Sequence, residues 1–200
     1  RIAAPRDAAR LTEEFLEAIE CEDAPTVLRF PKGSVGDDIP AVRRTVHGVD
    51  VLREAAHKDV LIVAVGAFAQ LGLDVADRLA AQGIGATVID PRWVVPVSPS
   101  VIELASAHRL VITNEDGIRV GGIGTRIRQD LRSAGVDTAV DELGLPDEFL
   151  EHATRDQILE TAGLTAQAIA RDVVAQVLGS RIPVARPLPD EQHVEKTQQN

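Results

Sequence analysis

Lys32 is the residue of this sequence best placed to do chemistry, because it stands between Pro31 and Gly33 directly after a short apolar run. Proline fixes φ and glycine allows a sharp exit of the chain, so the lysine ammonium would occupy a defined position. An ammonium held in this way suits an anionic group such as a phosphate. From the spacing alone, an exposed lysine in a turn explains the same three residues, so both interpretations stay open at this point.

Other patterns that carry chemistry by themselves are absent from the sequence. It has no G-x-S-x-G, no P-loop, no H-E-x-x-H and no C-x-x-C. The five histidines are scattered without metal-ligand spacing, and adjacent carboxylates such as Glu13 and Glu14 diverge on a helix or strand. The histidines are therefore interpreted as surface or packing residues, and the adjacent carboxylates as parts of solvated faces.

Composition limits the partners that the chain can have. A net charge of −10 over 200 residues argues against a general affinity for nucleic acid or for an anionic membrane surface. No run of about 18 apolar residues is present that could span a bilayer. With Cys21 as its single cysteine, the chain can form no internal disulfide, which favours a reducing, cytoplasmic setting.

The elements that must position Lys32 begin with a helix and a strand, expected over residues 7–19 and 25–30, which cannot close a core by themselves. Because the start also lacks an initiator methionine, we expect it to be internal sequence with missing neighbours. The predicted organisation has four parts: residues 1–35 as the end of a preceding α/β domain, 36–47 as a linker, 48–178 as a carboxyl-terminal domain, and 179–200 as a disordered tail.

From residue 59 onward, apolar runs alternate with amphipathic stretches. This rhythm predicts an α/β fold with a mostly parallel open sheet and helices on both faces. The expected strands are 60–66, 86–90, 110–113 and 138–140. The expected helices are 67–82, 99–107, 125–133, 155–161 and 165–178.

Two polar or glycine-rich segments follow the third of these strands. Asn114-Glu115-Asp116-Gly117 is predicted to form a turn at the carboxyl edge of the sheet, where open α/β folds usually place their working residues. Gly121-Gly122-Ile123-Gly124 introduces the next helix, and such glycines can bring backbone N–H groups near an anion. They lack the spacing of a dinucleotide fingerprint, so close packing of the helix is the favoured interpretation.

Several motifs, taken together and in order, resemble the carboxyl-terminal third of the 1-deoxy-D-xylulose-5-phosphate synthase family, a branch of the transketolase-like thiamine diphosphate enzymes. The resemblance runs from about residue 1 to residue 178. The motifs are Thr-Val-Leu-Arg-Phe-Pro-Lys-Gly at 26–33, Leu-Ile-Val-Ala-Val-Gly at 61–66, Asp-Pro-Arg-Trp-Val-Val-Pro at 90–96, Asn-Glu-Asp-Gly at 114–117 with Gly-Gly-Ile-Gly at 121–124, and Gly-Leu-Pro-Asp at 144–147.

The resemblance implies a reaction and a role for Lys32. Family members decarboxylate pyruvate and condense the two-carbon unit with glyceraldehyde 3-phosphate, which gives 1-deoxy-D-xylulose 5-phosphate and CO2 for isoprenoid, thiamine and pyridoxal biosynthesis. Lys32 matches the basic residue of the family's Pro-Arg-Gly or Pro-Lys-Gly motif, which is thought to contact the phosphate of glyceraldehyde 3-phosphate.

The same resemblance places the ligands of thiamine diphosphate and Mg²⁺ upstream of Arg1. It therefore implies no catalytic, cofactor-binding or metal-binding residue in this chain, and an isolated chain that is inactive. The implied partners are the upstream domains and a second subunit in a homodimer. Residues 114–117 and the glycines after them are the candidates for the subunit surface.

Two alternatives compete with this interpretation. One is another member of the transketolase superfamily, such as a 2-oxoacid dehydrogenase E1 β subunit or a transketolase, although the Gly-Leu-Pro-Asp and Pro-Lys-Gly segments fit those less well. The other is a non-catalytic, flavodoxin-like interaction module. A free-standing module should fold as a monomer with residues 7–30 packed on its own core.

Overall fold

A six-stranded sheet forms the centre of the protein, for which a computed structural model describes residues 1–179. The strand order is β3-β4-β6-β5-β8-β9. Strands β5 (Val60–Ala64), β6 (Ala86–Asp90), β8 (Leu110–Ile118) and β9 (Ala139–Leu145) are parallel. Strands β3 (Arg43–Arg44) and β4 (Asp50–Arg53) add an antiparallel edge. The predicted α/β fold with a mostly parallel sheet is confirmed.

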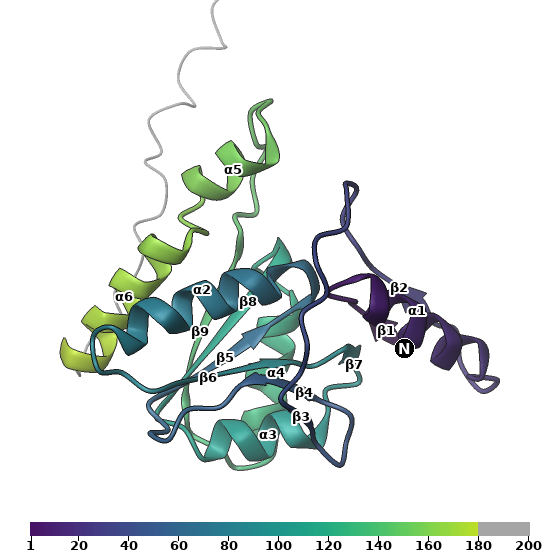
Figure 1. Cartoon of the computed structure of the whole chain (residues 1–200), viewed down its shortest axis with the longest axis horizontal. Helices are drawn as coiled ribbons and strands as arrows, with labels where there is room; N and C mark the ends of the chain where they lie inside the picture. The colour runs from purple at the N-terminus through teal and green to yellow at the C-terminus, as the bar shows by residue number, and fades with distance from the viewer. Residues whose placement is uncertain (180–200) are drawn as a thin grey trace, which may run out of the picture.

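Helices cover both faces of this sheet because its central strands are apolar on both sides (Figure 1). In β5, Val60, Ile62 and Ala64 contribute to one core cluster, which includes side chains of α2 (Ala69–Ala80) and α6 (Ala166–Gly179). Leu61 and Val63 contribute to the other, with α3 (Pro99–Ser106) and α4 (Ile123–Ser133). The two-residue period of a strand thus divides the core into two layers.

Local signals fix the helix ends close to where the sequence predicts them. The Ser98 hydroxyl accepts a hydrogen bond from the Ser100 amide at 3.3 Å and caps α3. Gly83 follows α2 with φ of +75°, a conformation that favours glycine. Thr154 and Gln157 form a capping box at the start of α5 (Arg155–Thr161).

The amino-terminal lobe consists of β1 (Ile2–Ala3), α1 (Ala8–Ile19) and β2 (Val27–Leu28). It is joined to the rest of the protein through β7 (Trp93–Val95), because a small sheet has the order β2-β1-β7 (Figure 1). The helix predicted over 7–19 is confirmed, and Asp7 caps it by accepting from the Arg10 amide at 2.7 Å. The strand predicted over 25–30 is shorter, and β1 was not predicted.

This lobe leaves several of its large apolar side chains exposed. Phe15, Leu16 and Ile19 of α1 are exposed, and so are Val27 and Phe30 near β2. A free-standing module would pack these residues on its own core, so their exposure argues against the flavodoxin-like alternative.

Three expectations need correction. Residues 114–117 do not form a turn: they continue β8, which reaches Ile118 and pairs there with Leu145 of β9. Asn, Asp and Gly are typical of turns, but here the segment continues β8, and its register with β9 shifts between Asn114 and Ile118. Strands β3 and β4 were not predicted, and β3 falls within the expected linker 36–47. Gly179 belongs to α6, and the rest of the predicted tail, 180–200, lies outside the described residues.

Candidate phosphate-binding site

Lys32 is exposed and lines two cavities, a smaller one of about 410 Å³ and a larger one of about 810 Å³. Pro31 and Arg155 line both cavities as well. Gly33 has φ of +154°, which side chains rarely tolerate, so the glycine is needed for the chain to leave Lys32 in this direction. Among residues 1–179, no carboxylate lies within ion-pairing distance of the Lys32 ammonium.

These cavities lie where the order of the sheet reverses. The chain runs from β5 to β6 on one side and then crosses to β8 on the other side of β5. Open α/β sheets bind ligands outside the carboxyl ends of the strands at such a switch point. Ala67, just after β5, lines the larger cavity, and Asp116, near the end of β8, lines the smaller one. The switch point of the sheet therefore faces the segment that carries Lys32.

Asp116 holds several elements around Lys32. Its backbone carbonyl accepts a hydrogen bond from Arg29, three residues before Lys32, and its carboxylate oxygens accept from Nη1 of Arg155 at 3.0 Å. The Arg155 guanidinium also lies over the ring of Phe68, 5.7 Å from its centroid. The contacts join the end of β2, β8, α5 and the 3-10 turn η1 (Gly66–Phe68).

The charges on the two cavity walls differ. In the smaller cavity Lys32 and Arg155 face one carboxylate, Asp116, and the other lining residues are apolar: Pro31, Leu145, Leu150, Ile158 and Leu159. In the larger cavity three cations face three carboxylates; these are Arg6, Lys32 and Arg155 with Asp7, Asp37 and Asp38. The smaller cavity thus carries the excess of positive charge, which suits an anion.

Sequence reasoning found Lys32 but missed Arg29, Asp116 and Arg155 as its neighbours. Asp116 was noted as part of a turn and of the candidate subunit surface, and Arg155 is far from Lys32 along the chain and stands in no motif. Its position depends on how α5 packs against the end of β8, which no local pattern reports.

The Glu115 carboxylate lies at the N-terminus of α4, directly after the glycines that could bring backbone N–H groups near an anion. Its carboxylate accepts from the Gly124 amide at 3.0 Å, within the first turn of α4. Burial raises the pKa of Glu115, although the hydrogen bonds from the Gly124 and Ile123 amides oppose the rise. A Cβ at Gly122 would collide with this carboxylate. The glycines therefore permit close packing, as predicted. The group that accepts hydrogen bonds at the N-terminus of α4 is the protein's own Glu115 carboxylate.

Part of the predicted subunit surface is buried. Asn114 and Glu115 are only 1% and 5% exposed, so neither side chain is available for contact with another subunit. Reversing the charge of Glu115 would disturb the start of α4 rather than report on dimer formation. Arg119 is half-buried, and the exposed apolar residues nearby are Ile118 and Val120.

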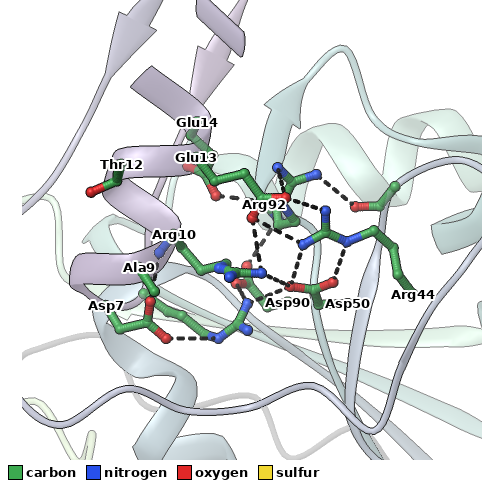
Figure 2. Close-up of polar contacts among 12 residues, drawn as sticks. Asp7, Ala9, Arg10, Thr12, Glu13, Glu14, Arg44, Asp50, Asp90 and Arg92 are labelled. Atoms are coloured by element: carbon green, nitrogen blue, oxygen red, sulfur yellow. Dashed lines mark hydrogen bonds and ion pairs between the residues drawn. The ribbon is translucent and has the colours of Figure 1, made fainter. Parts of the chain in front are cut away.

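A second charged region, which we call the buried ion network, lies between α1 and the sheet (Figure 2). One Arg6 nitrogen, Nη1, donates to Asp50 at 2.8 Å and to Asp90 at 2.7 Å, and these three side chains are at most 1% exposed. Arg44 of β3 donates to Asp50 at 2.6 Å and also bonds Glu13 of α1. Asp50 and Asp90 stand opposite each other in β4 and β6, so the register of these strands creates the acceptor pair.

The buried ion network keeps its charges through mutual hydrogen bonds. Burial alone raises the pKa of Asp50, but the bonds from Arg44 and Arg6 outweigh burial and leave that pKa below its ordinary value. Burial raises the pKa of Asp90 to about 6, against the opposing bond from Arg6, so Asp90 is still ionised at neutral pH.

Glu14 differs from the other carboxyl groups of the network because neither of its oxygens has a hydrogen-bond partner. Its nearest cation is Arg92, whose Nε lies 3.8 Å from Oε1. Burial raises the pKa of Glu14 to about 9, so this side chain is protonated at neutral pH. Arg92 has φ of +60°, and its guanidinium bonds Glu17 on the same helix.

Metal-binding groups are not found in this part of the chain. Residues 1–179 contain no group of three or more His, Cys, Asp or Glu side chains that could hold a metal ion. None of the helices among those residues is both long enough and apolar enough to cross a membrane.

Comparison with known proteins shows which family has this fold and these motifs. Residues 48–169 match the family model described as "Transketolase, C-terminal domain". The chain belongs to the transketolase C-terminal domain family. In this transketolase C-terminal domain, the matched residues include five strands of the large sheet, β4, β5, β6, β8 and β9, and the segment that holds Asp116 and Arg155.

Relatives with higher similarity support the more specific resemblance. The protein named 1-deoxy-D-xylulose-5-phosphate synthase in Leifsonia xyli subsp. xyli is 72% identical over 195 residues, which cover 98% of this chain and 30% of the relative. The protein of the same name in Clavibacter sepedonicus is 72% identical over 191 residues, which cover 96% of this chain and 29% of the relative. The resemblance to this family is confirmed, and the chain spans about 30% of the length of these relatives.

A solved structure supports the fold of the transketolase C-terminal domain. It is a split gene transketolase described as an inactive β4 tetramer, with a TM-score of 0.76 and 28% sequence identity. The similarity covers 90% of this chain and 58% of the solved chain, so it includes residues before the matched C-terminal domain.

Proposed function

We propose that this chain is the carboxyl-terminal portion of a 1-deoxy-D-xylulose-5-phosphate synthase. The whole protein would decarboxylate pyruvate and condense the two-carbon unit with glyceraldehyde 3-phosphate, which yields 1-deoxy-D-xylulose 5-phosphate and CO2 for isoprenoid, thiamine and pyridoxal biosynthesis. The observation that carries the proposal is the 72% identity to proteins of that name along almost the whole chain.

Within this function, Lys32 binds the phosphate of glyceraldehyde 3-phosphate. The cavity that it lines with Arg155 has an excess of positive charge, and the Pro31–Gly33 segment fixes where the ammonium stands. The amino-terminal lobe ends the pyrimidine-binding domain (residues 1–35), residues 36–47 connect it to the C-terminal domain, and the buried ion network packs the two together.

Thiamine diphosphate, bound with Mg²⁺, would supply the carbanion chemistry of the reaction in the whole protein. The described residues hold no cluster of metal-ligating side chains for Mg²⁺, and the family resemblance implies that the ligands of thiamine diphosphate lie in the part of the relatives that this chain does not span. We therefore assign both ligand sets to segments before Arg1 and derive no step through the cofactor.

The isolated chain would have no activity and would associate through surfaces that the whole protein covers. The solved split gene transketolase, described as an inactive β4 tetramer, supports this view by its similarity over 90% of the chain. For the whole protein we propose a homodimer in the cytoplasm.

The function is tested with the full-length protein. Purified enzyme given pyruvate, glyceraldehyde 3-phosphate, thiamine diphosphate and Mg²⁺ should release CO2 and form 1-deoxy-D-xylulose 5-phosphate. Two-carbon transfer from a ketose phosphate without CO2 release would instead indicate a transketolase. Acyl transfer to a lipoyl acceptor would indicate a 2-oxoacid dehydrogenase.

The role of Lys32 is tested by Lys32→Ala in the same full-length protein. Loss of one charge-assisted contact should raise the KM for glyceraldehyde 3-phosphate about 10- to 100-fold. The KM for pyruvate should stay close to that of the wild type, since pyruvate has no phosphate. Lys32→Arg should keep most of the affinity, and equal losses for both substrates would refute the assignment.

A further inference from the structure

We propose that Arg155 is a second cation of the substrate-phosphate site, and that it binds the same phosphate group as Lys32. The inference rests on the proposed function for the identity of the substrate. Its basis in the structure is separate: Lys32 and Arg155 are the two cations of the smaller cavity, and both also line the larger one.

The charge of the ligand calls for a second cation. A phosphate monoester carries a charge of about −1.5 to −2 at neutral pH and offers three strong acceptor oxygens. Lys32 supplies a single point charge, whereas a guanidinium presents a planar fork of donors that matches two phosphate oxygens. An arginine beside Lys32 therefore supplies both the missing charge and the geometry.

Arg155 has donors to spare for such a ligand. Its side chain is 43% exposed, and only Nη1 is engaged, by the two carboxylate oxygens of Asp116. Among residues 1–179, Nε and Nη2 of Arg155 have no hydrogen-bond acceptor. Of the other arginines nearby, Arg6 is committed to Asp50 and Asp90 within the core, and Arg29 lines neither cavity.

The contacts that hold Arg155 also prepare it to bind. Asp116 fixes one edge of the guanidinium, and the ring of Phe68 supports its face at 5.7 Å. A side chain held in this way loses little conformational entropy when a ligand arrives. The Asp116 carboxylate lies on the same cavity wall, but its two oxygens are turned to Arg155, so the cavity keeps a net positive charge.

The test compares a phosphorylated with an unphosphorylated aldehyde in the full-length enzyme. At saturating pyruvate, Arg155→Gln should raise the KM for D-glyceraldehyde 3-phosphate about 10-fold or more. The KM for D-glyceraldehyde, which lacks the phosphate, should not change. The KM of Arg155→Lys for D-glyceraldehyde 3-phosphate should lie between those of Arg155→Gln and the wild type. If Arg155→Gln does not fold, Arg155→Lys serves as the test variant. Arg132→Gln removes another exposed, ion-paired arginine that lines neither cavity, and it should leave both KM values unchanged.

A binding measurement separates this inference from the proposed function. Calorimetric titration of the full-length protein with glycerol 3-phosphate requires no turnover, and Arg155→Gln should weaken that binding about 10-fold or more. If the wild type forms no 1-deoxy-D-xylulose 5-phosphate, the proposed function fails, and the titration alone decides on Arg155. Unchanged KM and affinity in Arg155→Gln, equal changes for both aldehydes, or no binding by the wild type would overturn the role of Arg155.

Discussion

The buried ion network and the Lys32 cavities use the same residue types for opposite purposes. In the network, Arg6, Asp50 and Asp90 are almost completely inaccessible and bond one another. Around the cavities, Lys32 and Arg155 are accessible and keep donors without protein partners among the described residues. Charge alone therefore does not mark a functional site; what distinguishes the two regions is whether the protein itself already satisfies the charge.

The comparison also explains how the two regions depend on each other. Arg6 lies near the start of α1, and it bonds both the sheet and the Ile39 carbonyl, which follows the Lys32 segment, at 3.0 Å. The network thus fixes the far end of the loop whose first residues are Pro31 and Lys32, while Arg29 fixes its start through the Asp116 carbonyl. The paired charges of the network therefore help to position Lys32, whose charge has no partner among the described residues.

Asp90→Asn should give the largest effect, because it removes one charge from a buried pair. Arg6 would lose its charge-assisted bond to Asp90 but keep Asp50, and burial already disfavours the Asp90 charge, so we expect about 3 kcal/mol, the low end of the cost of breaking a buried pair. We expect α1 to lose protection against amide hydrogen exchange in the full-length protein by a comparable free energy. Exchange measured by mass spectrometry on peptides from residues 8–19 reports this change.

The matched control for that experiment is Asp137→Asn on the surface. Asp137 pairs with Arg132, and both side chains are mostly exposed, so its loss should cost less than about 1 kcal/mol. If Asp90→Asn left the exchange of α1 as the control does, the buried ion network would not hold α1 on the sheet.

Glu14→Gln should show the next largest effect, with a defined dependence on pH. The pKa of Glu14 is raised to about 9 by burial, so between about pH 4.5 and pH 9 the folded protein keeps a proton that the unfolded chain has lost. Stability from this group is therefore lost as the pH rises through that range, and it is constant above it. Glutamine cannot ionise, so the variant should be more stable than the wild type by roughly 1–3 kcal/mol at pH 8.

Glu13→Gln provides a control of opposite sign on the same helix. The hydrogen bond from Arg44 lowers the pKa of Glu13, so this carboxylate contributes stability above its ordinary pKa. Replacing it should weaken α1 at pH 8, whereas Glu14→Gln should strengthen it. The readout is the exchange of α1 amides between pH 5 and pH 9, corrected for intrinsic rates. A wild-type stability that does not fall over this range would contradict a neutral Glu14.

The sequence predicts the large sheet well because its strands are continuous apolar runs. Residues 86–90 and 155–161 match β6 and α5 without error, since a buried run and a capping box are local signals. The failures are short or polar strands. β1 and β3 have two residues each and exist because partners lie beside them, and residues 114–117 have the composition of a turn although they continue β8 between its pairs with β9 at Asn114 and Ile118.

The candidate site was predictable only in part, for the same physical reason. Lys32 stands between a proline and a glycine, which restrict the backbone on either side, so the sequence alone identifies it as a candidate. Asp116 and Arg155 reach it through the packing of β8 and α5, which depends on contacts distant in the sequence. The burial of Glu14 was not predicted either, because an adjacent pair of glutamates on a helix usually lies on a solvated face.

Asp116→Asn should give the smallest change in stability and completes the comparison with Asp90→Asn. The substitution is the same, but here the Asp116 and Arg155 side chains are 16% and 43% exposed, so water replaces much of what is lost. The Asp116 carbonyl still accepts from Arg29, because that bond uses the backbone. We expect a loss below about 1 kcal/mol in the exchange of α5 amides.

Salt distinguishes the two aspartates further. At about 1 M ionic strength the Debye length falls to about 3 Å, so the small effect of Asp116→Asn should vanish while that of Asp90→Asn persists. The measurement is amide exchange of α1 and α5 in the full-length variants at low and high salt. If Asp116→Asn cost as much as Asp90→Asn and resisted salt, the Asp116–Arg155 pair would be part of the protein's packing, and Arg155 would not be a cation kept for a ligand.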